Sequence, residues 1–274
     1  MGIKIHQIVT GELENTLAGH LLNSGSHPHH TIEQVLPHGF SIDHVLHDGT
    51  PAVGGFVPVP VWLLEGTSKR ILIDTGLGDL DEITAMTKRY GVATYATRSR
   101  DQDLVAGLAG HGLRPADVEI VVLTHVHFDH VGNNELFPNA TFIVQRSEVP
   151  QGFAPARYCQ FSYPEYAYKL TSLTDRIQVI DGDFQIEPGV RLLNIGGHTP
   201  GTMAVVIDTD QGRVALAGDL MYNYRNLELN WPTGAFWDLQ ALMNGYARLR
   251  LEADIIVPGH DWEFLTHFPS GTID

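Results

Sequence analysis

The stretch Thr124–His130, "THVHFDH", places three histidines and an aspartate within seven residues. It directly follows the apolar run "VEIVVL" at residues 118–123, which predicts a buried strand. Polar side chains clustered at the end of a buried strand are costly unless something binds them. A histidine-rich loop on the surface is the alternative interpretation, and the rest of the chain helps to decide between the two.

Candidate binding residues follow three further apolar runs. His198 comes after "LLNIGG", Asp219 after "VALAG" and His260 after "IIVPG". An open sheet gathers its binding site at the carboxyl ends of its strands, so these residues are expected to meet His125 and its neighbours. Because candidate binding residues follow four separate apolar runs, we expect one binding site rather than a histidine-rich surface loop.

The spacing predicts a first metal ion. His125 and His127 are two residues apart on an extended loop and can direct their imidazoles at one point. His198 completes a set of three histidines around that point. Neutral imidazole with carboxylate suits zinc, although iron, manganese and cobalt accept similar ligands.

A second metal ion is predicted beside the first. Asp129 and His130 are directed at a second point, where His260 joins them. Asp219 bridges the two ions in this interpretation, because one carboxylate has two oxygens and can neutralise a pair of dications. We therefore expect two Zn²⁺ ions per chain, held by His125, His127, Asp129, His130, His198, Asp219 and His260.

Charge and composition exclude several classes of partner. The net charge is −15, with 17 Lys and Arg against 32 Asp and Glu, so neither nucleic acid nor an anionic membrane is expected to bind. The sequence has no apolar run long enough for a membrane span or a signal peptide. A single cysteine, Cys159, rules out an internal disulfide and fits a reducing cytoplasm. We expect a cytoplasmic protein in which Cys159 is a buried or half-buried thiol.

Apolar patterning predicts strands that occur in pairs as well as in alternation with helices. This order favours two mixed sheets covered by helices over one doubly wound sheet. Residues 1–274 are expected to form a single domain, in which 1–55 are an irregular N-terminal arm or cap. Helices are predicted within 79–91, 101–113 and 237–250, and strands within 59–65, 70–76, 118–125, 140–145, 177–181, 190–196, 203–209, 213–219 and 254–260.

The N-terminal arm is rich in histidine. No strand or helix is predicted there that would hold these side chains around a metal ion, so we interpret the segment as a loop or cap. The histidines are His27, His29, His30, His38, His44 and His47.

The motif "THVHFDH", followed in order by "GGHTPGT", "AGD" and "PGHD", resembles the metallo-β-lactamase superfamily of binuclear metal hydrolases. The matching motifs run from "ILIDTG", which contains Asp74, to His260. The resemblance implies an α/β fold, an αββα sandwich of two mixed β-sheets flanked by helices, with the metals at the edge between the sheets. It also implies the ligand sets given above. Asp74 matches an aspartate that supports the ligand loop in the family, and a simple turn residue at the strand end is the alternative.

Within the superfamily, the chain resembles the branch of the N-acyl homoserine lactonases and 4-pyridoxolactonase. β-Lactamases usually carry cysteine where this chain has Asp219, and flavodiiron proteins carry glutamate where it has His127. Glyoxalase II enzymes carry an extension after the last histidine, whereas fourteen residues follow His260 here. "GDLMY" puts Tyr222 three residues after Asp219, as in the lactonases. One departure is Thr202 in "GHTPGT", where relatives often have a second histidine.

The resemblance implies a binuclear zinc-dependent hydrolase that opens a lactone ring, such as that of an N-acyl homoserine lactone, by attack of a metal-bridging hydroxide. Tyr222 would stabilise the oxyanion, unless it is only a packing residue, and Asp129 would carry a proton to the leaving alkoxide. A carboxylic ester, thioester or phosphoester substrate is the alternative, and a non-catalytic metal-binding protein belongs to another class. The expected partner is a small lactone or ester, and a homodimer is left open.

Overall fold

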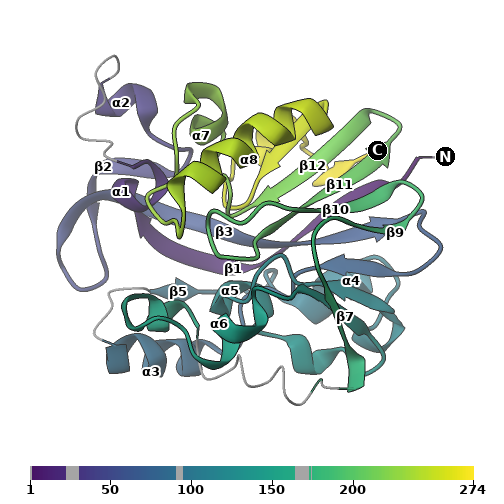
Figure 1. Ribbon diagram of the computed structural model, residues 1–274. Helices are drawn as coiled ribbons and strands as arrows, with labels where there is room; N and C mark the ends of the chain where they lie inside the picture. The colour runs from purple at the N-terminus through teal and green to yellow at the C-terminus, as the bar shows by residue number, and fades with distance from the viewer. Residues whose placement is uncertain (1, 23–30, 91–94, 164–172, 174) are drawn as a thin grey trace.

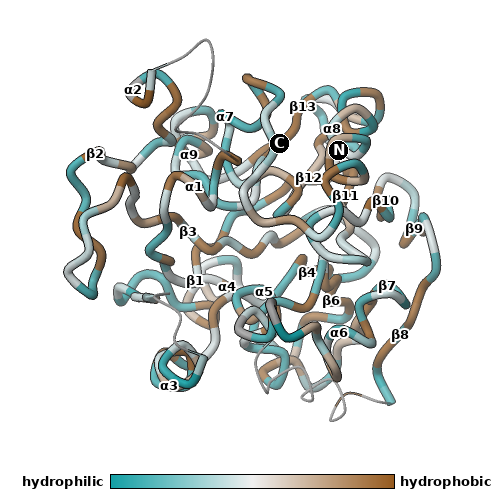
Figure 2. Tube along the Cα trace, turned by 60° about the vertical axis from the view of Figure 1, so that its left-hand side comes forward, coloured by the Kyte–Doolittle hydropathy of each residue, from teal (hydrophilic) through white to brown (hydrophobic). Residues whose placement is uncertain are grey.

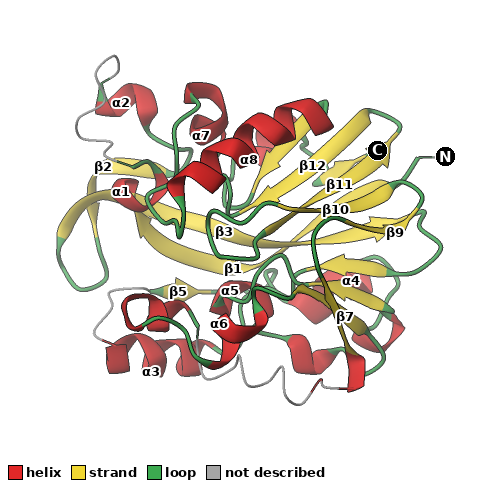
Figure 3. Ribbon diagram, in the orientation of Figure 1, coloured by secondary structure: helices red, strands yellow, loops and turns green. Residues whose placement is uncertain are grey.

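The computed structural model describes residues 2–22, 31–90, 95–163, 173 and 175–274. Two β-sheets pack face to face, and helices cover their outer faces (Figures 1 and 3). This is the αββα arrangement expected from the sequence. The described helices include none that is long and apolar enough to cross a membrane.

The larger sheet has nine strands in the described part of the chain. They are β1 Lys4–Thr16, β2 Phe40–Val45, β3 Pro51–Glu65, β4 Ile71–Ile73, β5 Ala96–Thr97, β6 Ile120–Val122, β7 Thr141–Gln145, β8 Ile177–Ile180 and β14 Thr272–Ile273. The main path is β14-β1-β3-β4-β6-β7-β8, while β2 pairs with β3 and β5 with β1. Strands β1, β3 and β4 are antiparallel neighbours, whereas β4, β6, β7 and β8 run parallel, so the sheet is mixed.

The smaller sheet has the order β13-β12-β11-β10-β9 among the described residues. Its strands are β9 Phe184–Glu187, β10 Val190–Asn194, β11 Met203–Thr209, β12 Gly212–Gly218 and β13 Ile255–Pro258. Strand β11 is antiparallel to both β10 and β12, and β13 is parallel to β12. The carboxyl ends of β10, β12 and β13 therefore lie at one edge of this sheet.

Two of the described helices begin directly after an aspartate cap. Asp103 and Asp238 each accept a hydrogen bond from a backbone N–H in the first turn of the helix that follows, α4 and α8 respectively. The helices are α1 Leu17–His20, α2 Ile32–Val35, α3 Leu80–Tyr90, α4 Leu104–Gly110, α5 Phe128–Val131, α6 Val149–Phe153, α7 Tyr224–Leu229, α8 Leu239–Glu252 and α9 Phe264–His267. Three 3₁₀ helices, Pro115–Asp117, Asn134–Leu136 and Arg157–Ser162, complete the described helical segments.

Alternating side chains along the strands build three hydrophobic layers. Leu64 and Val205 belong to the core between the sheets, whereas their neighbours Leu63 and Val206 pack on the outer faces with α4 and α8 respectively. Successive side chains of a strand point to opposite faces, so a strand covered on both sides is hydrophobic throughout. Figure 2 shows this in the brown strands β4 and β13.

The expectation that residues 1–55 are irregular is wrong for most of the described part of this range. Residues 4–16 form the long strand β1, which pairs with β3 over most of its length, and α1, α2, β2 and the start of β3 also lie in the range. The alternating pattern of this strand is interrupted by a shift in register between Val9 and Glu12, next to Gly11. That irregularity changes which residues face the core, and so hides the strand from a search for period two. The prediction of a single domain over 1–274 stays a prediction.

We predict that Gly132→Ala lowers the free energy of unfolding by about 1–3 kcal/mol, the usual cost of an overpacked site. Gly132 ends helix α5, and a Cβ there would lie 2.1 Å from Gly78 N and 2.6 Å from Gly76 O. The change is measured by equilibrium unfolding in denaturant, with protein from which a chelator has removed any metal. Gly110→Ala is the control, because a Cβ there meets no atom within 4 Å. Equal stabilities of the two variants would contradict the prediction.

Candidate metal centre

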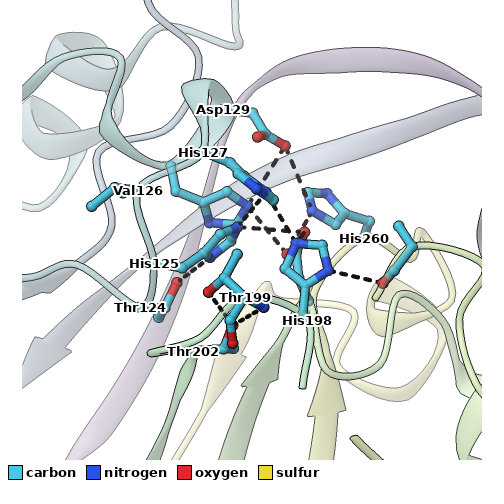
Figure 4. Close-up of polar contacts among 12 residues, drawn as sticks. Thr124, His125, Val126, His127, Asp129, His198, Thr199, Thr202 and His260 are labelled. Carbon is cyan, nitrogen blue, oxygen red and sulfur yellow. Dashed lines mark hydrogen bonds and ion pairs between the residues drawn. The ribbon is translucent and has the colours of Figure 1, made fainter. Parts of the chain in front are cut away.

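The seven residues predicted to bind metal lie together at the edge between the two sheets, in two groups whose donor atoms are each within 4.8 Å of one another. Figure 4 shows the imidazoles of His125, His127 and His198 turned toward one another, with Asp129 and His260 beside them. The first group comprises His125, His127, His198 and Asp219, and the second comprises Asp129, His130 and His260.

Three ring nitrogens converge in the first group. His127 Nδ1 lies 3.0 Å from His125 Nε2 and 3.0 Å from His198 Nε2. Nitrogens that bind one zinc ion in tetrahedral geometry, with bonds of about 2.0–2.1 Å, are about 3.3 Å apart. The three imidazoles therefore have nearly the spacing that a shared ion requires.

The second group is buried and holds an imidazole nitrogen without a hydrogen bond. Asp129 Oδ2 lies 3.6 Å from His130 Nε2 and 3.8 Å from His260 Nε2. His130 Nε2 also lies 3.1 Å from Asp219 Oδ1, yet it has no hydrogen-bond partner of acceptable geometry among the described residues. A buried polar atom in this state calls for a partner, and a metal ion is one that fits a histidine nitrogen.

Asp219 lies between the two groups. Its Oδ1 is 3.0 Å from His260 Nε2 and 3.1 Å from His130 Nε2, while Oδ2 is 3.3 Å from His198 Nε2. The two carboxylate oxygens thus face different groups. Gly259 allows this close approach, because a Cβ there would lie 2.8 Å from the backbone of Gly218 and 3.3 Å from Asp219 Oδ1.

In three of the histidines, the second ring nitrogen, Nδ1, contacts a hydrogen-bond acceptor on another segment of the chain. His260 Nδ1 donates to Pro58 O (2.9 Å), and His198 Nδ1 donates to Ala235 O (3.0 Å). His130 Nδ1 lies 2.8 Å from Asp74 Oδ2. These contacts set the tautomer so that Nε2 is the nitrogen available in the site. The carbonyls of Pro58 and Ala235 could not be found in the sequence, because every residue carries one.

Asp74 supports the loop that carries the first ligand candidates. Its Oδ1 accepts from Thr124 N (2.8 Å), and its Oδ2 accepts from Thr124 Oγ1 (2.7 Å) as well as from His130. Asp74 also ends strand β4 with a φ of 62°, in the left-handed region that aspartate tolerates. Both interpretations of this residue therefore apply, since it is a turn residue whose carboxylate ties the ligand loop to the sheet.

Burial and charge act differently on the two groups. Burial lowers the pKa of His125 and His198, which favours the neutral imidazole that binds a metal ion. Burial also opposes a charge on His130 and His260, but the negative charges of Asp219 and Asp129 outweigh it and raise the pKa of both. The second group is thus a site of negative potential, which favours a cation.

A cavity of about 220 Å³ opens onto these residues. One wall comes from the N-terminal strands and the other from the ligand loops. Among the described residues, the aromatic-rich segments 149–163 and 230–237 contribute Ser162 and Ala235 to the lining. The lining residues are Leu13, Glu14, Asn15, Gly19, Val57, His127, Phe128, Asp129, Ser162, His198, Asp219, Tyr222, Ala235 and His260.

Tyr222 lines the cavity next to one histidine of each donor group. Its ring centroid is 5.8 Å from that of His198 and 5.5 Å from that of His260. Burial, together with the charges of Asp219 and Asp129, raises the pKa of Tyr222 well above its usual value, so its hydroxyl keeps the proton near neutral pH. A protonated phenol at this position is a hydrogen-bond donor.

The described histidines of the N-terminal arm take no part in the two groups. His27, His29 and His30 lie outside the described residues. His44 Nε2 and His47 Nδ1 contact the buried Glu14 carboxylate at 3.0 and 2.7 Å. Among the described histidines of the arm, none joins a group of metal donors, so these two hold strand β2 and the turn after it against β1.

Comparisons with known proteins agree with this geometry. The N-acyl homoserine lactonase of a Bacillus species is 30% identical over 232 residues, which cover 81% of this chain and 89% of the relative. The N-acyl homoserine lactonase AttM of Rhizobium radiobacter is 26% identical over 226 residues, 77% of this chain and 85% of the relative. A solved structure of an N-acyl homoserine lactone hydrolase with its product bound at the catalytic metal center has a TM-score of 0.73, 25% identity and 97% coverage of both chains.

The family model of the metallo-beta-lactamase superfamily matches residues 54–260. Its range begins in strand β3 and ends at His260, so it contains both groups of donors. The fold and the family that the sequence motifs imply are thereby confirmed. The chain belongs to the metallo-beta-lactamase superfamily.

Proposed function

We propose that the protein is a binuclear metal-dependent lactonase whose substrate is an N-acyl homoserine lactone or a similar small lactone. The observation that carries the proposal is the position of Asp219, whose two oxygens face two separate groups of donors beneath a cavity that Tyr222 lines. The relatives named as N-acyl homoserine lactonases support the substrate class.

The donor set suits two divalent transition metals, because it consists of five imidazoles and two carboxylates, most of them buried. Bound in the two groups, the ions would supply a hydroxide nucleophile at neutral pH and a Lewis acid for the lactone carbonyl. We propose zinc in both, with iron, manganese or cobalt as alternatives of similar ligand preference.

Two side chains of the cavity are proposed to act on the substrate. The Tyr222 hydroxyl donates a hydrogen bond to the carbonyl oxygen as that oxygen gains negative charge, an interaction that is stronger in the transition state than in the ground state. Asp129, which also lines the cavity, accepts the proton that the attacking hydroxyl carries and passes it to the ring oxygen as the ring C–O bond breaks. Ring opening then yields a carboxylate and a hydroxyl on one product molecule.

The apolar part of the cavity wall favours a lactone with an acyl substituent over a phosphoester. Leu13, Val57 and Phe128 lie on this wall, and the chain carries a net charge of −15, so a dianionic phosphate would meet little positive charge from the protein. Carboxylic esters and thioesters remain the alternative substrates. A purely structural role for the metals is disfavoured, because the donors face a cavity that a substrate can enter.

The substrate proposal is tested with a panel of N-acyl homoserine lactones of several chain lengths, aromatic lactones, aryl esters, a thioester and a phosphotriester. We expect the highest kcat/KM for a lactone. Higher kcat/KM for an ester or a phosphotriester would assign the site to that substrate instead, and no turnover of any compound by metal-replete protein would support the non-catalytic alternative.

The metal proposal predicts about two transition-metal ions per chain by elemental analysis. His125→Ala removes one of three converging imidazoles, so it should lower the metal content and the lactonase activity together, since loss of a ligand weakens binding. His267→Ala is the control, because His267 is exposed on α9 and belongs to neither group. Full activity of metal-free protein would contradict the proposal.

Tyr222→Phe should keep both metals but lower kcat for a lactone by roughly 10- to 1,000-fold, the range expected for loss of one oxyanion donor. Tyr224→Phe is a matched control, since Tyr224 is equally buried at 8% exposure, does not line the cavity, and has a hydroxyl with no hydrogen-bond partner among the described residues. Asp219→Asn should instead weaken metal binding. Unchanged lactone turnover in Tyr222→Phe would remove the proposed role.

A further inference from the structure

Glu148 is a fully buried acidic residue that takes no part in the proposed chemistry. It lies just after strand β7 at the start of helix α6, and its side chain is 0% exposed. Its carboxyl group makes three contacts, and none of them is with a metal-ligand candidate or with the cavity. A buried carboxyl group is costly, so its partners indicate what it stabilises.

The partners of Glu148 belong to two different ligand loops. Glu148 Oε2 accepts from Val126 N at 3.2 Å, and Val126 stands between His125 and His127. Glu148 Oε1 accepts from Gly201 N and Thr199 Oγ1, both at 2.6 Å. Thr199 directly follows His198, so one carboxyl group joins the loops that carry all three imidazoles of the first group.

Two threonines extend this contact. Thr199 Oγ1 donates to Glu148, so the hydroxyl of Thr202, 2.6 Å away, donates to Thr199 Oγ1. Thr202 Oγ1 in turn accepts from Thr199 N at 2.8 Å. Figure 4 shows Thr199 and Thr202 next to each other, to the left of His198. Thr202 stands where related motifs often have a second histidine, and here its hydroxyl closes the turn that follows His198.

The loop after His198 is shaped to pack on Glu148. A Cβ at Gly201 would lie 2.6 Å from Ser147 Oγ and 2.8 Å from Glu148 Cγ, so only glycine allows this approach. Ser147 Oγ also donates to Pro200 O at 3.2 Å. The turn at 199–202 is therefore held at several points by the segment 147–148.

We propose that Glu148, with Thr199 and Thr202, is a positioning group that fixes the His125–His127 loop relative to His198 and so sets the metal affinity of the first group. The three imidazoles come from two sheets, since His125 and His127 follow β6 of the larger sheet and His198 follows β10 of the smaller one. Without a link between these loops, a bound ion would itself have to hold them together. Pre-set ligands bind an ion more tightly, because less conformational freedom is lost on binding.

The test is the affinity of the first group for Zn²⁺, measured in competition with a chromophoric chelator. In Glu148→Gln an amide NH₂ replaces one acceptor oxygen and cannot accept from both loops. We expect one of two binding steps to weaken by roughly 10- to 100-fold, as is typical for partners of metal ligands. That step should be the one that His125→Ala removes, and an unchanged step in Glu148→Gln overturns the proposal.

Thr202→Val keeps the shape of the side chain but removes the hydroxyl. It should weaken the same step by roughly 2- to 10-fold, which corresponds to one hydrogen bond, and Thr202→Ser should restore it. This pair keeps the test decisive if Glu148→Gln does not fold. Failure of serine to restore the affinity overturns the role of the hydroxyl.

Asp103→Ala separates positioning from loss of stability. Asp103 caps helix α4, where it accepts a hydrogen bond from Ala106 N at 2.8 Å, and it is not among the residues that line the cavity. Loss of the cap should lower the Tm of metal-free protein and leave both Zn²⁺ binding steps unchanged, and a weakened first step in this variant overturns the proposal. The inference rests on the proposed metal centre but not on the lactone substrate. Wild-type protein that binds no Zn²⁺ overturns both, whereas unchanged affinity in Glu148→Gln overturns the inference alone.

Discussion

Seven polar side chains at one sheet edge, six of them buried, impose the main constraint on this molecule. His125, His130, Asp219 and His260 are each less than 5% exposed, and their donor atoms face one another instead of water. Bringing such groups together without a counter-charge costs free energy, since imidazoles repel when protonated and carboxylates lose hydration. The carboxylates of the second group favour a cation there. Two cations would satisfy every donor at once, and the rest of the fold forms a frame that keeps these donors in place.

The frame consists mainly of backbone groups and of carboxyl groups that hold the ligand loops through hydrogen bonds. Asp74 ties the Thr124 backbone to strand β4, Glu148 ties the same loop to the turn after His198, and Pro58 O orients His260. Each tie joins segments that are far apart in sequence. The ligand geometry therefore depends on the packing of the two sheets.

The sequence predicted the family, the layered fold and the seven clustered residues, because each signal is local. Apolar runs such as that of β6 end in a histidine or aspartate, and parallel neighbours bring those ends together. Strand β1 was missed because its register shift near Gly11 interrupts the alternation, and the partners of Glu148 were missed because two of the three are backbone N–H groups. The functions of Tyr222 and Asp129 depend on a substrate and stay predictions.

The missed strand has a consequence for specificity. Leu13, Glu14 and Asn15 of β1 line the cavity opposite the ligand loops. His44 and His47 contact the Glu14 carboxylate and so fix its position. The metal-ligand candidates thus come from loops that carry recognisable sequence motifs, whereas the facing wall of the cavity comes from a segment without such a motif. Sheet register places this wall, since Leu13 pairs with Val57, which also lines the cavity. Under the proposed function this wall would contact the substituent of the lactone, so changes in β1 and β3 would alter which substituent is accepted without removing a ligand side chain.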